Sequence, residues 1–270
     1  MFFHQVHNSI GDNVYNAYIY RGIKWLTHLH KGFEFAIVLD GEIEAEIGDK
    51  RYALKSGEAL LLTPYQLHSY ESSADSLTFV AVFSGNYTEL FARATAGKEA
   101  KNPILTLSAE TRAYIDKNLL FANAENPATQ TNESTAVEKP NDLTLKACLY
   151  AVCAEFYAST EFLARTHDNA LVSDILAYVE NNYASNITLK TMADSLGYDF
   201  RYISRIFGKI FEINFKTLVN QYRCDRAKRL ISSTDETLSE IAMNSGFQSI
   251  RSFNRVFKEF TGKTPSDLRK

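Results

Sequence analysis

The first third of the chain alternates between polar and apolar positions with a period of two. In residues 42–47 the apolar side chains take one face and the glutamates the other, which is typical of a half-buried strand. Residues 77–83 are apolar on both faces and predict a fully buried strand. Regular turn signals separate such segments, and these are Gly11, Gly22, Gly32, Gly41, Gly48 and Gly57. The pattern indicates an all-β sandwich or barrel that ends near Ser84.

The middle of the chain changes to a helical period. Apolar residues recur at three- and four-residue intervals over about 108–122 and 142–165, which predicts two helices. Between them, residues 123–141 have almost nothing to bury and predict a mobile loop. The apolar stripe of 142–165 must be buried somewhere, either on the barrel of its own chain or against a second subunit.

From Leu171 onward the pattern is wholly helical and contains an internal repeat. Thr188, Leu189, Ala193 and Gly197 recur as Thr237, Leu238, Ala242 and Gly246, and Ile203, Ser204, Arg205 and Phe207 as Phe253, Asn254, Arg255 and Phe257. Each copy opens with a threonine suited to N-capping, turns at its glycine and continues as an amphipathic helix. The sequence therefore predicts two helix-turn-helix units, joined by one long helix over 215–231.

The second helix of each unit carries arginine and small polar residues on the face away from its apolar stripe. In the first unit these are Arg201, Ser204, Arg205 and Lys209, and in the second Arg251, Ser252, Asn254, Arg255 and Lys258. Such side chains can read base edges and phosphates in a major groove. The alternative is a helical repeat that docks another protein, with the arginines as ordinary solvated charges.

Charge separates the two parts of the chain. The 270 residues carry a net charge of −3, divided into +4 for residues 171–270 and −7 for the first 170. A basic carboxy-terminal module predicts a polyanion partner for that module. The composition, 45% hydrophobic and 23% charged, excludes fibrous and disordered classes, and we expect no membrane segment. The amino terminus does not read as a secretion signal, and the three cysteines are odd in number, so we expect a cytoplasmic protein with reduced thiols.

The repeat resembles a known family. The spacing of Ala242, Gly246, Phe247, Phe253, Phe257, Lys258, Gly262, Pro265 and Arg269 is similar to the signature of AraC-type transcriptional regulators, over about the last 100 residues. The resemblance implies DNA contacts from Arg201, Ser204 and Arg205 in the first unit, and from Ile250, Arg251, Ser252, Asn254 and Arg255 in the second. Asp199 stands where serine is commoner and Glu212 where glycine is usual, so the first unit departs from the pattern at both ends of its second helix.

The amino-terminal part resembles the cupin barrel, whose double-stranded β-helix serves as a sensor in many AraC-type regulators. The first cupin motif is matched by Gly22, His28, His30, Glu34 and Gly41, and the second by Gly57, Pro64 and His68. Gln66 and Ser72 replace the usual glycine and asparagine of the second motif. Independently of the family, a period-two strand places His28 and His30 on one face, which Glu34 and His68 could join.

Three imidazoles and a carboxylate suit a divalent transition metal. The alternative is inherited pattern, with the histidines lining an effector pocket and no metal bound, and we expect no cofactor. The candidate pocket residues for a small-molecule effector are aromatic or belong to this cluster. They are Trp25, His28, His30, Glu34, Phe35, Tyr65, His68, Tyr70 and Phe83.

These observations predict an α+β protein of two domains that regulates transcription and catalyses nothing. Residues 1–100 form the cupin-like barrel, 101–168 a helical connector, and 169–270 an all-α DNA-binding domain of two helix-turn-helix units. The expected partners are promoter DNA, a small-molecule effector of unknown identity, a second copy of the chain and RNA polymerase. The rival hypothesis is a metal-dependent cupin enzyme fused to a DNA-binding domain.

Overall fold

The computed structural model describes residues 3–4, 13–120, 134–165, 167–211 and 213–269. The chain divides into two compact units, with Phe3–Ala170 in the first and Leu171–Lys270 in the second. The helical segment that the sequence assigned to a connector therefore belongs to the first unit. Within the described residues, no helix is long and apolar enough to cross a membrane.

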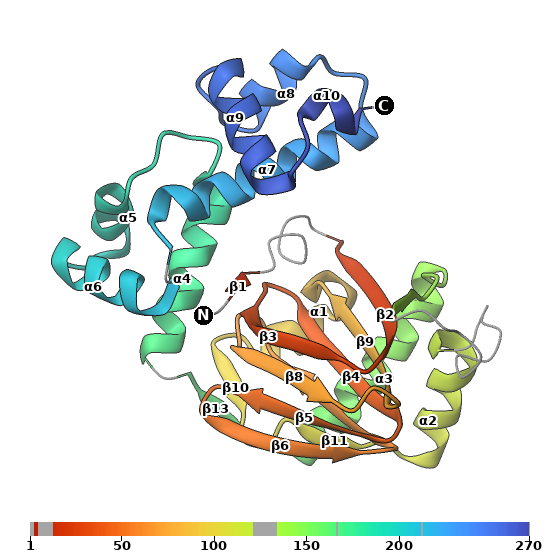
Figure 1. Cartoon of the computed structure of the whole chain (residues 1–270). Coiled ribbons are helices and arrows are strands. Elements are labelled where there is room, and N and C mark those ends of the chain that lie inside the picture. The colour runs from red at the N-terminus through yellow and green to blue at the C-terminus, as the bar shows by residue number, and fades with distance from the viewer. Residues whose placement is uncertain (1–2, 5–12, 121–133, 166, 212, 270) are drawn as a thin grey trace. The chain divides into compact units, whose positions relative to one another are not determined.

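The first unit is built on two sheets (Figure 1). One has the strand order β1-β3-β8-β5-β6 and the other β11-β7-β4-β9-β2-β12. Their strands are β1 (Phe3–His4), β2 (Tyr15–Arg21), β3 (Lys24–Leu29), β4 (Phe33–Asp40), β5 (Glu42–Ile47), β6 (Lys50–Lys55), β7 (Glu58–Leu62), β8 (His68–Ser72), β9 (Leu77–Phe83), β11 (Ile104–Thr106) and β12 (Ser134–Ala136). A separate antiparallel pair joins β10 (Lys98–Ala100) to β13 (Phe162–Ala164).

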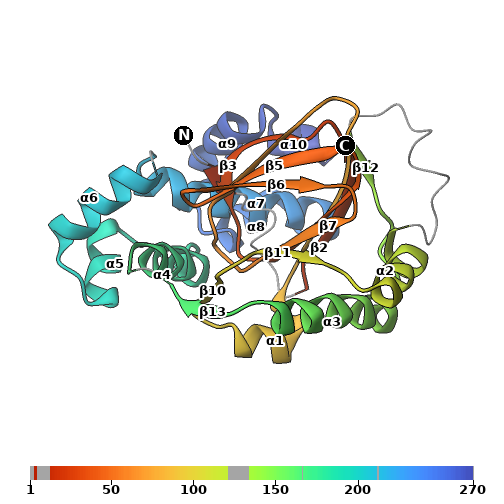
Figure 2. The same cartoon turned by 90° about the horizontal axis from the view of Figure 1, so that it is seen from below.

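Alternation along the central strands sorts their side chains between two cores. In β4, Ala36 and Val38 face a core between the sheets, where they meet Ala45 of β5 and Tyr70 of β8. The intervening Phe35 and Ile37 face a second core. Figure 2 shows α1 (Glu89–Ala94), α2 (Ala109–Ile115) and α3 (Asp142–Ser159) along that outer face of the six-stranded sheet. The predicted β-rich first part and helical second part are confirmed.

The apolar stripe of α3 is buried within its own domain. Leu145, Leu149, Val152 and Phe156 are at most 1% exposed and lie in the core against the sheet. Of the two alternatives for this stripe, packing on its own barrel is correct for these four residues, while Leu163, the last residue of the predicted stripe, lies in β13 and is 44% exposed. The helix also ends at Ser159, before the predicted residue 165, because Thr160 is extended and leads into β13.

Two further segments differ from the prediction. The helix expected over 108–122 is α2, which continues from Asp116 to Leu120 as a π-helical turn. Most of the predicted mobile loop 123–141 lies outside the described residues. Its end does not remain a loop, since Ser134–Ala136 forms β12 and pairs with β2.

The second unit contains the predicted repeat of helices. Its helices are α4 (His167–Asn182), α5 (Leu189–Leu196), α6 (Phe200–Phe211), α7 (Phe215–Ser233), α8 (Leu238–Asn244), α9 (Ile250–Thr261) and α10 (Pro265–Leu268). Thr188 and Thr237 form capping boxes at the starts of α5 and α8. Gly197 and Gly246 follow α5 and α8 with φ of 75° and 87°, the left-handed conformation that glycine adopts without steric cost. The predicted linking helix is α7.

Candidate functional site

The first candidate DNA-reading helix is α6. The Asp199 carboxylate accepts hydrogen bonds from the backbone N–H groups of Arg201 (2.9 Å) and Tyr202 (3.2 Å), so it caps the helix as predicted. The apolar stripe is buried, and the predicted contacts Arg201, Ser204 and Arg205 are exposed. The Arg205 guanidinium lies over the Tyr202 ring at 5.7 Å from its centroid. The Lys209 side chain, also predicted to contact DNA, and Glu212 lie outside the described residues.

The second candidate reading helix is α9, which Ser249 caps by accepting from the Ser252 N–H. Ser252 is half-buried, and its hydroxyl donates to the Ser249 carbonyl at 2.8 Å. The other predicted contacts are exposed, and these are Ile250, Arg251, Asn254, Arg255 and Lys258. Arg255 pairs with Glu259 at 3.2 Å, but both side chains are about two-thirds exposed, so the pair is weak and can open for DNA.

The structure exposes one residue of α6 that the sequence analysis did not single out. Phe200, the first residue of the helix, is 45% exposed. The signal that could have found it is the 50-residue shift of the repeat, which places Phe200 opposite Ile250. Ile250 is 42% exposed at the first position of α9.

A second candidate site lies between the two sheets, where His28, His30, Glu34 and His68 come together. All four are buried, and one ligand atom from each lies within 4.8 Å of the others. His30 Nε2 is 2.9 Å from Glu34 Oε2, and His68 Nε2 is 3.5 Å from Glu34 Oε1. The Tyr70 hydroxyl donates to Glu34 Oε1. The sequence prediction that these four residues meet is therefore confirmed.

The backbone orients all three rings in the same way. Nδ1 of His28, His30 and His68 lies 2.9, 3.1 and 2.8 Å from the carbonyl oxygens of Leu26, Gly32 and Gln66. A carbonyl only accepts, so each Nδ1 carries a proton and each Nε2 faces the cluster. Nε2 of His28 and of His68 has no hydrogen-bond partner among the described residues. The Glu34 carboxylate also only accepts, so the 2.9 Å contact of His30 Nε2 requires a positive charge there, from a second ring proton or from a metal.

Burial and electrostatics act in opposite directions on this cluster. Burial, with the neighbouring His68, lowers the pKa of His28 to about 3, so the ring is neutral at pH 7. Burial alone would raise the pKa of Glu34, but His68 and the hydrogen bond from His30 hold it well below its usual range. Glu34 is therefore an ionised carboxylate beside three imidazoles, and carboxylate oxygen and imidazole nitrogen are ligands that suit a divalent transition metal.

The nine residues expected to line an effector pocket fall into three places. Trp25 and Tyr70 adjoin the histidine cluster. The ring centroid of Trp25 lies 5.8 Å from that of Tyr70 and 5.4 Å from that of His28. Phe35 and Phe83 do not reach the space between the sheets, because alternation directs them into the core under the helices. Tyr65 lies elsewhere, in the wall of a pocket at one end of the barrel.

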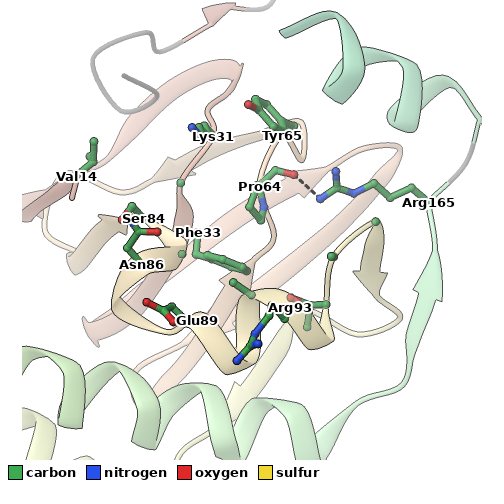
Figure 3. A pocket seen from close by; sticks show the side chains of 16 residues that line it. Val14, Lys31, Phe33, Pro64, Tyr65, Ser84, Asn86, Glu89, Arg93 and Arg165 are labelled. Carbon is green, nitrogen blue, oxygen red and sulfur yellow. Dashed lines mark hydrogen bonds between the residues drawn. The ribbon is translucent and has the colours of Figure 1, made fainter. Parts of the chain in front are cut away.

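That pocket has a volume of about 530 Å³ and is formed by loops and by α1 (Figure 3). The turn before β4 contributes Lys31, the first residue of β4 is Phe33, which also lines the pocket, and the loop between β7 and β8 contributes Pro64 and Tyr65. Arg165 donates to the Pro64 carbonyl at 2.6 Å. Tyr65 has a φ of 62°, which is uncommon for a bulky residue and strained. Four charged side chains line the pocket, namely Lys31, Glu89, Arg93 and Arg165.

Sequence comparison assigns both units. Residues 17–117 match the AraC-like ligand binding domain, and residues 192–270 match a helix-turn-helix domain. A ligand-binding domain of the AraC type is thus followed by a helix-turn-helix domain, which confirms the predicted resemblance to AraC-type regulators. AraC-type proteins are regulators of transcription, so the comparisons favour a regulator over the cupin-enzyme alternative.

Individual relatives agree with this AraC-type assignment. The chain is 32% identical over 98 residues to an uncharacterized HTH-type transcriptional regulator of Staphylococcus aureus, of whose length it covers only 13%. It is 21% identical over 262 residues to the melibiose operon regulatory protein of Escherichia coli, covering 90% of this chain and 83% of that protein. The crystal structure of ToxT from Vibrio cholerae matches over 96% of this chain and 97% of its own, with a TM-score of 0.51 and 14% identity, and so supports the fold. A second ToxT structure contains an unsaturated fatty acid.

Proposed function

We propose that the protein regulates transcription by placing α6 and α9 on two adjacent segments of DNA, with an affinity that a small molecule in the first unit modulates. The observation that carries the proposal is the equivalence of the exposed arginines. Arg201 and Arg205 on α6 match Arg251 and Arg255 on α9 in the repeat. A repeat that docks protein would not require basic residues on both second helices.

Selection of genomic fragments by the purified full-length chain at physiological salt tests this function. We expect an enriched sequence with two half-elements about one helical turn, or 10 base pairs, apart. The matched control is the doubly substituted protein Arg205→Ala/Arg255→Ala, which should enrich nothing. If parent and control retain the same fragments, the protein does not read sequence through these helices.

The effector site that we propose is the pocket at the end of the barrel. Its volume of about 530 Å³ lies within the range of small-molecule sites. Three cationic side chains and one carboxylate line it, beside the apolar surface of Phe33 and Pro64. This balance favours a small molecule that combines an anionic group with an apolar part.

The chain itself offers a route from this pocket to the DNA-binding unit. Arg165, which lines the pocket, lies two residues before the start of α4 at His167. Its guanidinium is held by Pro64, from the loop that carries Tyr65. A ligand that alters this contact would change the segment that leads into the second unit. Such a ligand would change the affinity for DNA only to the extent that it binds the DNA-binding state and the non-binding state of the protein unequally.

Reversing the charge of two side chains that line the pocket should abolish the pocket's preference for anionic ligands. For Lys31→Glu/Arg93→Glu, we expect that carboxylic acids which raise the melting temperature of the parent lose their effect, because attraction becomes repulsion. The measurement is a thermal-shift comparison of carboxylic acids with their neutral amides. Lys50→Glu/Arg51→Glu, at two exposed positions of β6, is the control for the same change of net charge. Equal responses to acids and amides in the parent would contradict an anion site.

We also propose that the histidine cluster holds one divalent transition metal. The support is geometric: three Nε2 atoms and an ionised carboxylate converge, and each ring is fixed through Nδ1. A metal there would neutralise the buried charge of Glu34. Since His28 and His68 belong to β3 and β8 while Glu34 belongs to β4, it would also tie the two sheets together.

Metal removal should therefore destabilise the first unit. We expect about one metal per chain in protein purified without an affinity tag, and a loss of about 2.7 kcal/mol on chelation from a free metal concentration of 100 times the Kd. His68→Ala should abolish binding, while Ser69→Ala, its neighbour on β8, should not. Elemental analysis and thermal unfolding measure both effects. Untagged parent protein that stays metal-free after incubation with zinc, manganese, iron and nickel would contradict the site.

Homodimerisation and a contact with RNA polymerase remain predictions. Two subunits would double the number of reading helices and match paired DNA elements. Because the α3 stripe is buried in its own domain, a dimer must use other surfaces. Light scattering with and without DNA measures the oligomeric state.

A further inference from the structure

The two reading helices carry the same two rows of exposed side chains. In α6, Phe200 and Ser204 form one row and Arg201 and Arg205 the other, and all four are exposed. Residues four apart in a helix lie on one face, so each row runs along the helix. In α9 the equivalent rows are Ile250 with Asn254 and Arg251 with Arg255, and these four are also exposed. Each helix thus begins with an apolar residue beside an arginine.

Core packing does not account for the two apolar residues. Seven other large apolar residues of α6 and α9 are 8% exposed or less, and they are Ile203, Ile206, Phe207, Phe211, Phe253, Val256 and Phe257. Phe260, near the end of α9, is 37% exposed. Phe200 and Ile250 are 45% and 42% exposed. Large apolar side chains beside exposed arginines need a partner that is apolar at one point and anionic around it.

The major groove of DNA offers that combination. The C5-methyl group of thymine is an apolar feature of the groove floor, and phosphates flank it on both sides. In a helix-turn-helix the first residues of the second helix are those that contact base edges. Phe200 and Ile250 hold that position in α6 and α9, with Arg201 and Arg251 next to them.

We infer that Phe200 and Ile250 are specificity-determining residues that each contact a thymine methyl group, at equivalent positions of two similar half-elements. The inference rests on the proposed DNA-binding function. It adds that the two half-elements share a thymine at the equivalent position. Because the rows match in chemistry and order, the half-elements read by one chain form a direct repeat. Ser204 and Asn254, which differ between the rows, allow the half-elements to differ at the position that follows.

Replacement of single thymines by deoxyuridine tests the inference, since deoxyuridine lacks only the methyl group. With an operator from the fragment selection, we expect one thymine per half-element whose replacement weakens binding of the parent by about fourfold, the factor for burial of one methyl group. Phe200→Ala should lose sensitivity at the first of these thymines and keep it at the second. Ile250→Ala should do the reverse. Phe260→Ala, which removes another exposed aromatic ring of α9, should keep both.

The outcome separates this inference from the proposed function. If an operator is enriched but Phe200→Ala and Ile250→Ala retain the parent's affinity, or its full sensitivity to deoxyuridine, the thymine contacts are wrong and the function stands. If no operator is enriched, the proposed function fails and this inference fails with it. Because both residues are exposed, their replacement leaves the folded core intact, and circular dichroism of the variants verifies this.

Discussion

Arg205→Ala and Arg255→Ala are expected to weaken binding to the operator by about 1–3 kcal/mol each, which is the range for loss of a bidentate contact to guanine. Both arginines are exposed and occupy equivalent positions of the repeat. The loss should concentrate on the operator, with a smaller loss on unrelated DNA. Titration by fluorescence anisotropy over a series of salt concentrations measures both affinities.

Two lysines provide the comparison. Lys258→Ala should weaken binding to all sequences alike and reduce the salt slope by about 1, because Lys258 is predicted to contact phosphate. Lys190→Ala removes an exposed cation of α5, outside the reading helices, and should change neither quantity. An arginine variant whose affinity falls equally on operator and unrelated DNA would be assigned to phosphate instead of a base.

Gly246→Ala is expected to destabilise the second unit by about 2–5 kcal/mol, from a left-handed backbone combined with a steric clash. Gly246 has a φ of 87°, and a Cβ there would lie 2.6 Å from Ala184 Cα and 2.8 Å from its carbonyl oxygen. Backbone atoms cannot rotate aside as a flexible side chain would, so the turn between α8 and α9 must shift. Urea denaturation followed by circular dichroism measures the loss.

The repeat supplies a matched control for this substitution. Gly197 occupies the same position in the first unit with a φ of 75°, but a Cβ there would meet nothing within 4 Å. Gly197→Ala should therefore cost only the backbone strain, about 1–2 kcal/mol. Equal losses for the two variants would show that the approach of Ala184 contributes nothing.

Features set by local sequence were predictable. The threonine caps, the glycine turns and the helical repeat follow from neighbouring residues, and the structure reproduces them at Thr188, Gly197, Thr237 and Gly246. The histidine cluster was predictable as well, because a strand of period two fixes which side chains share a face.

Features set by tertiary packing were not predictable from this sequence. A stripe such as that of α3 indicates burial but not its partner, and alternation alone does not say which face of β4 is the interior. Phe35 was therefore assigned to the wrong core. Of this pocket only Tyr65 was predicted, since Lys31, Arg93 and Arg165 come from separate segments and their side chains meet only after folding.

The carbonyl groups that orient His30 and His68 link the proposed metal site to the proposed effector pocket. They belong to Gly32 and Gln66, and Gly32 lines the pocket, as do Pro64 and Tyr65 immediately before Gln66. A molecule that settles against these loops thus acts on the same backbone that aims the imidazoles. By thermodynamic linkage, a ligand that changes the affinity for metal by some factor has its own affinity changed by that factor. If that factor is greater than one, the barrel would work as a coincidence detector, which responds fully only when metal and ligand are present together.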